Sequence, residues 1–157
     1  MQKKRGFTLI ELLVVIGIIA ILAAIVVIAV NPGRQFKQAR DAQRWSDTNA
    51  VLNAIHQYAV DHKGDVPSEI DSLDTLQILG TGTGCLTSCA KKTSLAACLN
   101  LYDKLVGDQQ TYLTAIPQDP SFGSAADTEY YVNKDANGRI EVGACQPEIE
   151  TSISVTR

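Results

Sequence analysis

A single carboxylate stands inside a long apolar run near the start of the chain. Residues 7–30 contain one ionisable side chain, that of Glu11, in 24 positions. On insertion scales, a carboxylate costs about 2.5–3.5 kcal/mol at the centre of a membrane-spanning helix and less near its end. Glu11 is explained either by a cationic partner or by a place at the membrane surface, where water and the helix dipole stabilise it.

A cut in the chain would create the cationic partner. Cleavage after Gly6 would expose the amine of Phe7, which lies four residues before Glu11. An identical subunit could supply the same amine across an interface. Such an amine would give Glu11 a specific cationic partner.

The four cysteines are the second chemically distinctive set. All of them follow the apolar run, and an even number of cysteines in an exported region favours disulfide bonds. Of the three pairings that four cysteines allow, we slightly favour Cys89 with Cys98 and Cys85 with Cys145. Zinc binding is the weaker alternative, because no two cysteines have C-x-x-C spacing and the two histidines lie six residues apart.

Other motifs give weaker indications. The glycines of the GTGTG segment, residues 80–84, resemble a phosphate-binding loop, but no Gly-Lys-Ser/Thr sequence follows them, so we predict a surface loop. Neither G-x-S-x-G nor H-E-x-x-H occurs in the chain. We expect neither catalytic activity nor a cofactor.

Charge is distributed unevenly along the 157 residues. The formal net charge is −3, but residues 64–157 alone contain 6 basic and 13 acidic side chains. Residues 1–6 contain three basic side chains and no acidic one. Because nucleic-acid-binding domains are usually basic, the acidic C-terminal part argues against a dedicated nucleic-acid site.

The apolar run is long enough to cross a bilayer. A helix of 24 residues extends about 36 Å, whereas the hydrocarbon core is about 30 Å thick. The basic residues before it predict a cytoplasmic N-terminus and an exported C-terminal part. A cleaved signal peptide is disfavoured, because its apolar region normally has about 7–15 residues.

The pattern after the run predicts that the helix continues to residue 63 with a kink at Pro32. Gly64 and Pro67 then end it. This second half is amphipathic, because residues of one apolar stripe recur at three- and four-residue steps. The stripe consists of Thr48, Val51, Leu52, Ile55, Tyr58 and Ala59.

Shorter elements follow the long helix. We predict a short strand at 76–79, a second helix over 95–106, a hairpin with a type I′ turn at Asn137-Gly138, and a strand over 149–155. The predicted fold class is α+β, with a long N-terminal helix, apolar then amphipathic, packed on a small antiparallel sheet. The predicted regions are a leader (1–6), a membrane helix (7–30) and a head (31–157) that includes the amphipathic half-helix (31–63).

The segment KKRGFTLIELLVVI, residues 3–16, closely resembles the processing signature of type IV prepilins and of the pseudopilins of type II secretion and competence systems. The resemblance implies that a prepilin peptidase cuts between Gly6 and Phe7 and methylates the new amine. It implies that Glu11 meets this amine on a neighbouring subunit. It also implies a pilin-like fold, a helical filament of identical or similar subunits, and a pilus assembly machinery as partner.

The expected function is therefore that of a structural subunit of a type IV pilus, located in the cytoplasmic membrane before assembly and on the cell surface afterwards. A pseudopilin and a permanently anchored extracytoplasmic binding domain are the alternatives. Adhesion, motility and DNA uptake all stay open as roles of the fibre. Asp119, Asp127 and Glu129 lie in a region that loosely resembles the calcium-binding segment of some major pseudopilins, which makes a calcium site a weaker alternative.

Overall fold

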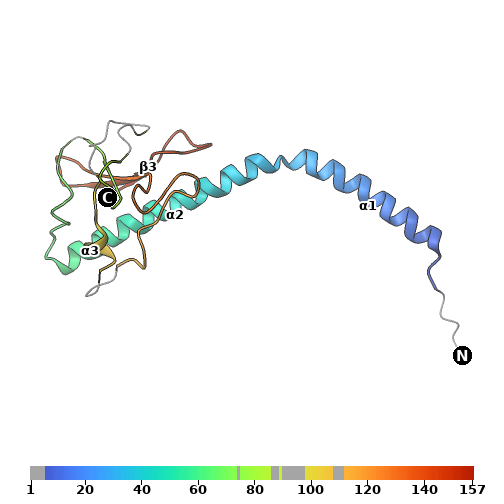
Figure 1. The fold of residues 1–157 in the computed structure, drawn as a ribbon, viewed down its shortest axis with the longest axis horizontal. Helices are drawn as coiled ribbons and strands as arrows, with labels where there is room; N and C mark the ends of the chain where they lie inside the picture. Colours follow the sequence, from blue (N-terminus) through green and yellow to red (C-terminus); the bar gives the residue numbers. More distant parts are fainter. Residues whose placement is uncertain (1–5, 74, 86–88, 90–97, 108–111) are drawn as a thin grey trace, which may run out of the picture. The chain divides into compact units, whose positions relative to one another are not determined.

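The structure is a computed structural model that describes residues 6–73, 75–85, 89, 98–107 and 112–157. The chain divides into two compact units, Met1–Phe36 and Lys37–Arg157. The fold class is α+β, as predicted: a long apolar N-terminal helix precedes a head with a small antiparallel sheet (Figure 1).

The first helix, α1, spans Leu9–Val30 and buries none of its residues. Among the described residues it is the one helix that is long and apolar enough to cross a membrane. Its side chains are apolar all around its circumference, apart from Glu11 near its start. Such a helix is stable only in lipid or against other helices.

A local break separates α1 from the second helix, α2, which spans Pro32–Asp61. Asn31 adopts a left-handed conformation with φ 46° and ψ 77°, and Pro32 is the first residue of α2. The sequence predicted one kinked helix, whereas the structure has two helices. The physical reason is that proline is favoured at the first helical position and clashes with a preceding turn, while asparagine tolerates the left-handed region.

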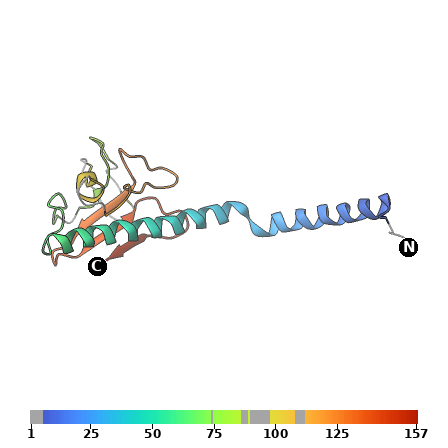
Figure 2. The ribbon, with the colours of Figure 1, turned by 90° about the horizontal axis from the view of Figure 1, so that it is seen from below.

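The second unit is built around the amphipathic part of α2. Side chains of α2 pack with those of the sheet in one hydrophobic core, and Figure 2 shows the helix lying along the sheet. The predicted stripe is confirmed, with Tyr58 half-buried and its other five residues buried. The buried residues of α2 are Asp41, Arg44, Thr48, Val51, Leu52, Ala54, Ile55 and Ala59.

Four antiparallel strands form the sheet in the order β1-β2-β3-β4. They are β1 Gln77–Ile78, β2 Tyr130–Lys134, β3 Ile140–Ala144 and β4 Ile153–Thr156. Side chains of β2 alternate between the two faces, because Tyr130 and Val132 join the core with α2 while Tyr131 joins a second cluster. The sheet therefore has buried side chains on both of its faces.

The predicted hairpin is present, but its turn is not type I′. Gly138 has a positive φ of 83°, and Asn137 does not. The Gly138 N–H donates to the Asp135 carbonyl (2.9 Å), and the Arg139 N–H donates to the Asp135 carboxylate (2.8 Å). These bonds favour the three-residue hairpin with one left-handed glycine over the two-residue turn.

The predicted second helix is much shorter than expected. The structure has α3 at Tyr102–Leu105, and Leu99 instead forms an isolated parallel bridge with Leu79. The Leu99 N–H donates to the Ile78 carbonyl (2.7 Å). It is therefore not available for a hydrogen bond within a helix. The start of the predicted helix, residues 95–97, lies outside the described residues.

We predict that Gly143→Ala destabilises the head by about 1–3 kcal/mol. A Cβ atom on Gly143 would overlap the ring of Tyr131, its partner on β2. Tyr131 is buried and its hydroxyl donates to the Glu141 carboxylate (2.9 Å), so the ring cannot simply move away. Denaturant unfolding of the two proteins measures the loss.

Gly84→Ala is the matched control, because nothing lies within 4 Å of the Cβ that it adds. Equal stabilities of the Gly143→Ala and Gly84→Ala variants would show that Tyr131 does not require a glycine opposite it.

Candidate processing and assembly site

The Gly6–Phe7 peptide bond lies just before the first helix and is open to solvent. Both residues are exposed, and the Phe7 side chain is 88% exposed. A Cβ placed on Gly6 would meet no atom within 4 Å. The backbone on both sides of this bond is non-helical, so a peptidase can reach it without unwinding α1.

Thr8 and Glu11 form a capping box at the start of α1. The Glu11 N–H donates to the Thr8 hydroxyl oxygen (3.3 Å). In return, the N–H and the hydroxyl of Thr8 both donate to Oε2 of Glu11 (2.8 and 2.6 Å). The reciprocal bonds hold the carboxylate beside the peptide that follows Phe7. Thr8 thus gives the Glu11 carboxylate hydrogen-bond partners within its own chain, a role of Thr8 that was not predicted from the sequence.

The other carboxylate oxygen of Glu11 is available to a further donor. Within the part of the chain that the structure describes, Oε1 accepts no hydrogen bond. An amine at Phe7, freed by cleavage, is a charged donor of the kind that bonds most strongly to a carboxylate. The predicted site residues thus lie together, and capping leaves Glu11 able to bind a cation.

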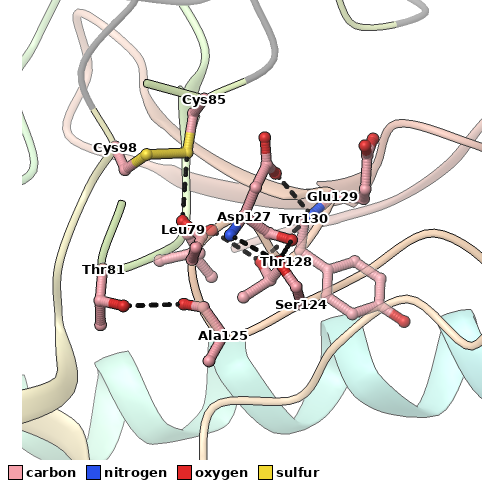
Figure 3. Close-up of a disulfide and its surroundings, with 11 residues drawn as sticks. Leu79, Thr81, Cys85, Cys98, Ser124, Ala125, Asp127, Thr128, Glu129 and Tyr130 are labelled. Carbon is pink, nitrogen blue, oxygen red and sulfur yellow. Dashed lines mark hydrogen bonds between the residues drawn. A yellow bond between two sulfur atoms is a disulfide. The ribbon is translucent and has the colours of Figure 1, made fainter. Parts of the chain in front are cut away.

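The cysteines are paired differently from our prediction. Cys85 bonds to Cys98 and Cys89 to Cys145. The sequence prediction had slightly favoured Cys89 with Cys98 and Cys85 with Cys145. The physical reason is the parallel bridge at Leu99, which brings the preceding Cys98 beside the segment that follows β1. Figure 3 shows the Cys85–Cys98 bond above the turn that carries Ala125 and Thr128.

The glycine-rich segment is a backbone contact and not a phosphate loop. The N–H groups of Thr81 and Gly82 donate to the carbonyls of Ala125 and Ala126 (3.1 and 2.9 Å). A Cβ on Gly80 would overlap the Ala126 carbonyl. Gly80 therefore permits a close approach of two chain segments.

The described residues give no support to the calcium alternative, because Asp119 already binds a cation of the protein. Its two carboxylate oxygens accept hydrogen bonds from Nε and Nη2 of Arg44 (2.6 and 3.0 Å). Asp127 closes its own turn by accepting the Glu129 N–H (3.1 Å). Burial raises the pKa of Glu129, and nearby Asp127 raises it further. Among the described residues, no three acidic, histidine or cysteine side chains gather as metal ligands.

Arg44 is the centre of a buried ionic network in the head. Its side chain is 0% exposed and is bound by three carboxylates, those of Asp119, Asp41 (2.8 Å) and Glu148 (3.1 Å). Arg40 also donates to Glu148, with Nη2 2.6 Å from Oε1. The network joins α2 to two segments that lie far from it in the sequence.

Asp41 extends this network to the backbone. Its carboxylate accepts the N–H groups of Glu148, Ile149 and Glu150 (3.0, 2.8 and 3.1 Å). Burial raises its pKa, but the three backbone donors and Arg44 outweigh burial, and the net pKa is lowered. Asp41 thereby fixes the chain that leads from β3 to β4.

This network was not predicted from the sequence, although the sequence contains a signal for it. Asp41 and Arg44 continue the three- and four-residue spacing of the stripe that begins at Thr48. Opposite charges on the core side of an amphipathic helix indicate a buried ion pair, because an unpaired buried charge is too costly.

Comparison with known proteins identifies the N-terminal segment. Residues 1–27 match the family described as the prokaryotic N-terminal methylation motif, which is the type IV prepilin-like signature. The chain carries this signature, as the resemblance implied. No curated protein and no solved structure matches the chain. The motif supports a type IV pilin-like or pseudopilin protein.

We predict that Arg44→Met lowers the free energy of unfolding by about 3–5 kcal/mol, because Asp119 and Asp41 lose their buried counter-ion. Arg139→Met is the control: its ion pair with Asp135 is exposed, and such pairs contribute about 0–1 kcal/mol. Denaturant unfolding of the full chain in detergent compares the two. Equal losses would mean that the network does not stabilise the head.

Acid should weaken the network through Glu148. Its ion pairs with Arg40 and Arg44 lower its pKa from 4.5 to about 2. A lowered folded-state pKa stabilises the protein above the unfolded value, and this stabilisation is lost as the pH falls from 4.5 to about 2. We therefore expect the stability difference between the wild type and Glu148→Gln to shrink over this interval.

The stability difference between wild type and Glu150→Gln provides the baseline, since Glu150 is exposed. Unfolding curves taken at neutral pH and at steps down to pH 2 give both differences. A wild-type advantage over Glu148→Gln that stays constant with pH would contradict the assignment.

Proposed function

We propose that the chain is a structural subunit of a type IV pilus. The precursor is anchored in the cytoplasmic membrane by α1, with its N-terminus in the cytoplasm and its head outside. A prepilin peptidase cuts between Gly6 and Phe7, and the Phe7 amine is methylated. The subunit then polymerises through α1 into a filament on the cell surface, with the assembly machinery as its partner. The chain itself is not an enzyme.

One observation carries this proposal: the methylation motif at residues 1–27 ends within a helix that buries no residue. A helix that is apolar on every side needs a membrane before assembly and other helices after it. The cleavage site lies immediately before this helix and is exposed. Processing and burial of α1 are thus properties of one short stretch of chain.

Glu11 supports an ordered assembly. In the precursor its Oε2 caps the helix through Thr8. After cleavage the amine of an incoming or neighbouring Phe7 is a charged donor for Oε1. In lipid or in a filament core an unpaired carboxylate is costly, so pairing with this amine favours one register between subunits. A contact repeated head to tail without closing generates a helical filament.

The motif is also compatible with a pseudopilin that forms a short fibre for secretion or DNA uptake. The length of fibres on cells separates the two functions: long filaments favour the pilus, and their absence favours the pseudopilin. The acidic part of the head, residues 64–157, argues against a dedicated nucleic-acid site in either case.

The test is the intact mass and the N-terminal residue of protein recovered from sheared surface material. We expect a chain that begins at methylated Phe7. Glu11→Leu and Glu11→Gln should both insert into the membrane, and both should lose filaments, because neither can pair with an amine as a carboxylate does. Glu11→Gln is the sharper variant, since glutamine can still form the capping box.

Uncut protein confined to the membrane fraction, in cells that contain the peptidase, would overturn the proposal and favour a permanently anchored binding domain. Normal filaments from Glu11→Leu would show that Glu11 has no role in assembly. Normal filaments from Glu11→Gln, with none from Glu11→Leu, would assign the role of Glu11 to helix capping.

A further inference from the structure

The two disulfide bonds overlap along the chain. Cys85 pairs with Cys98 and Cys89 with Cys145, so each bond encloses one cysteine of the other. Cys89 lies between the other two early cysteines and bonds to neither of them. Its partner comes last in the sequence, after β2 and β3.

The partners of the two bonds are positioned by different parts of the fold. Cys98 precedes Leu99, whose N–H and carbonyl bond to the Ile78 carbonyl (2.7 Å) and to the Gly80 N–H (3.0 Å). The segment just after β1 thus holds Cys98 near Cys85. The Cys145 N–H instead donates to the Glu129 carbonyl (2.9 Å), as a continuation of the ladder between β2 and β3.

Cys145 therefore reaches its place only when β2 and β3 have paired. Both bonds lie in one cluster with Leu76, Ile78 and Tyr131, on the face of the sheet that α2 does not cover. In the folded head each thiol is close to its own partner. In the unfolded chain nothing but sequence separation distinguishes the partners.

Sequence separation favours the wrong bonds. The cost of closing a loop rises with its length, so Cys85–Cys89 and Cys89–Cys98 close more readily than Cys85–Cys98, whose separation is 13 residues, or Cys89–Cys145, at 56. Both of these shorter bonds join Cys89 to a cysteine that is not its native partner, Cys145. If the head is exported as proposed above, on which this inference rests, its first three thiols meet an oxidising compartment before Cys145.

We propose that the head passes through a non-native bond at Cys89 and is a substrate of a dithiol–disulfide isomerase in the exported compartment. The isomerase thiolate attacks Sγ of Cys85 in the Cys85–Cys89 bond, and Cys89 leaves as a thiolate that takes a proton from water. The Cys98 thiolate, having given its proton to water, then displaces the isomerase from Cys85. One S–S bond breaks and one forms, without net oxidation.

The second native bond needs an oxidant. Once β2 and β3 have paired, the thiols of Cys89 and Cys145 pass two electrons and two protons to the disulfide of a thiol oxidoreductase, which becomes a dithiol. The Cys89–Cys145 bond is thus the last to form, and it forms only after β2 and β3 have paired.

The experiment follows the bonds during refolding of the full chain in detergent. Reduced, denatured protein is returned to native buffer with reduced and oxidised glutathione, and samples are alkylated over time and mapped without reduction. Trypsin together with a protease that cuts after Leu86 separates all four cysteines. We expect Cys85–Cys89 or Cys89–Cys98 before Cys89–Cys145, and a purified dithiol isomerase should accelerate Cys89–Cys145 severalfold.

The matched variant is Cys85→Ser with Cys98→Ser, which leaves Cys89 no partner but Cys145. The isomerase should not change its rate of oxidation. An equal acceleration in this variant would overturn the inference, as would a wild type that forms both native bonds directly and ignores the isomerase. If the variant fails to fold, the wild-type time course still decides.

This outcome is independent of fibre formation. A chain that rearranges its bonds as expected but never forms filaments supports this inference and overturns the proposed function. A chain that forms filaments and never contains a non-native bond supports the proposed function and overturns this inference.

Discussion

A guanidinium without exposure to water must be neutralised from several sides, and Arg44 meets this demand with carboxylates from three segments. Asp41 comes from the same helix, Asp119 from the chain before β2, and Glu148 from the chain between β3 and β4. Each carboxylate would be costly to bury alone. The head therefore has one arrangement of these segments on α2 in which every charge is paired, and the position of β4 follows from it.

The long-range pattern of the fold could be predicted from the sequence because it depends on periodicity. The stripe from Thr48 to Ala59 specifies the buried face of α2 without knowledge of its partner. The elements that were predicted wrongly are those where local hydrogen bonds compete with the predicted turn or helix. The carboxylate of Asp135 accepts two N–H groups of the turn and changes its type, and the bridge at Leu99 takes residues from the predicted helix. The cysteine pairing depends on that same bridge, so spacing alone could not give it.

The candidate site was predictable because its residues are contiguous. Gly6, Phe7 and Glu11 lie within six positions. Their residue types indicate both the cleavage position and the pairing of the new Phe7 amine with the Glu11 carboxylate. Thr8 was overlooked since its role appears only when the helix start is known. Arg44 was overlooked for another reason, because a buried cation is recognised by partners such as Asp119, which is 75 residues away.

The Cys89–Cys145 bond also determines how the head can respond to a pull along its chain. Tension that reaches Cys89 along the backbone crosses directly to Cys145. The chain between these two cysteines, including α3, β2 and β3, lies off this covalent path. While this bond is intact, stretching can unwind α2 or peel away β4, but it cannot extend β2 or β3.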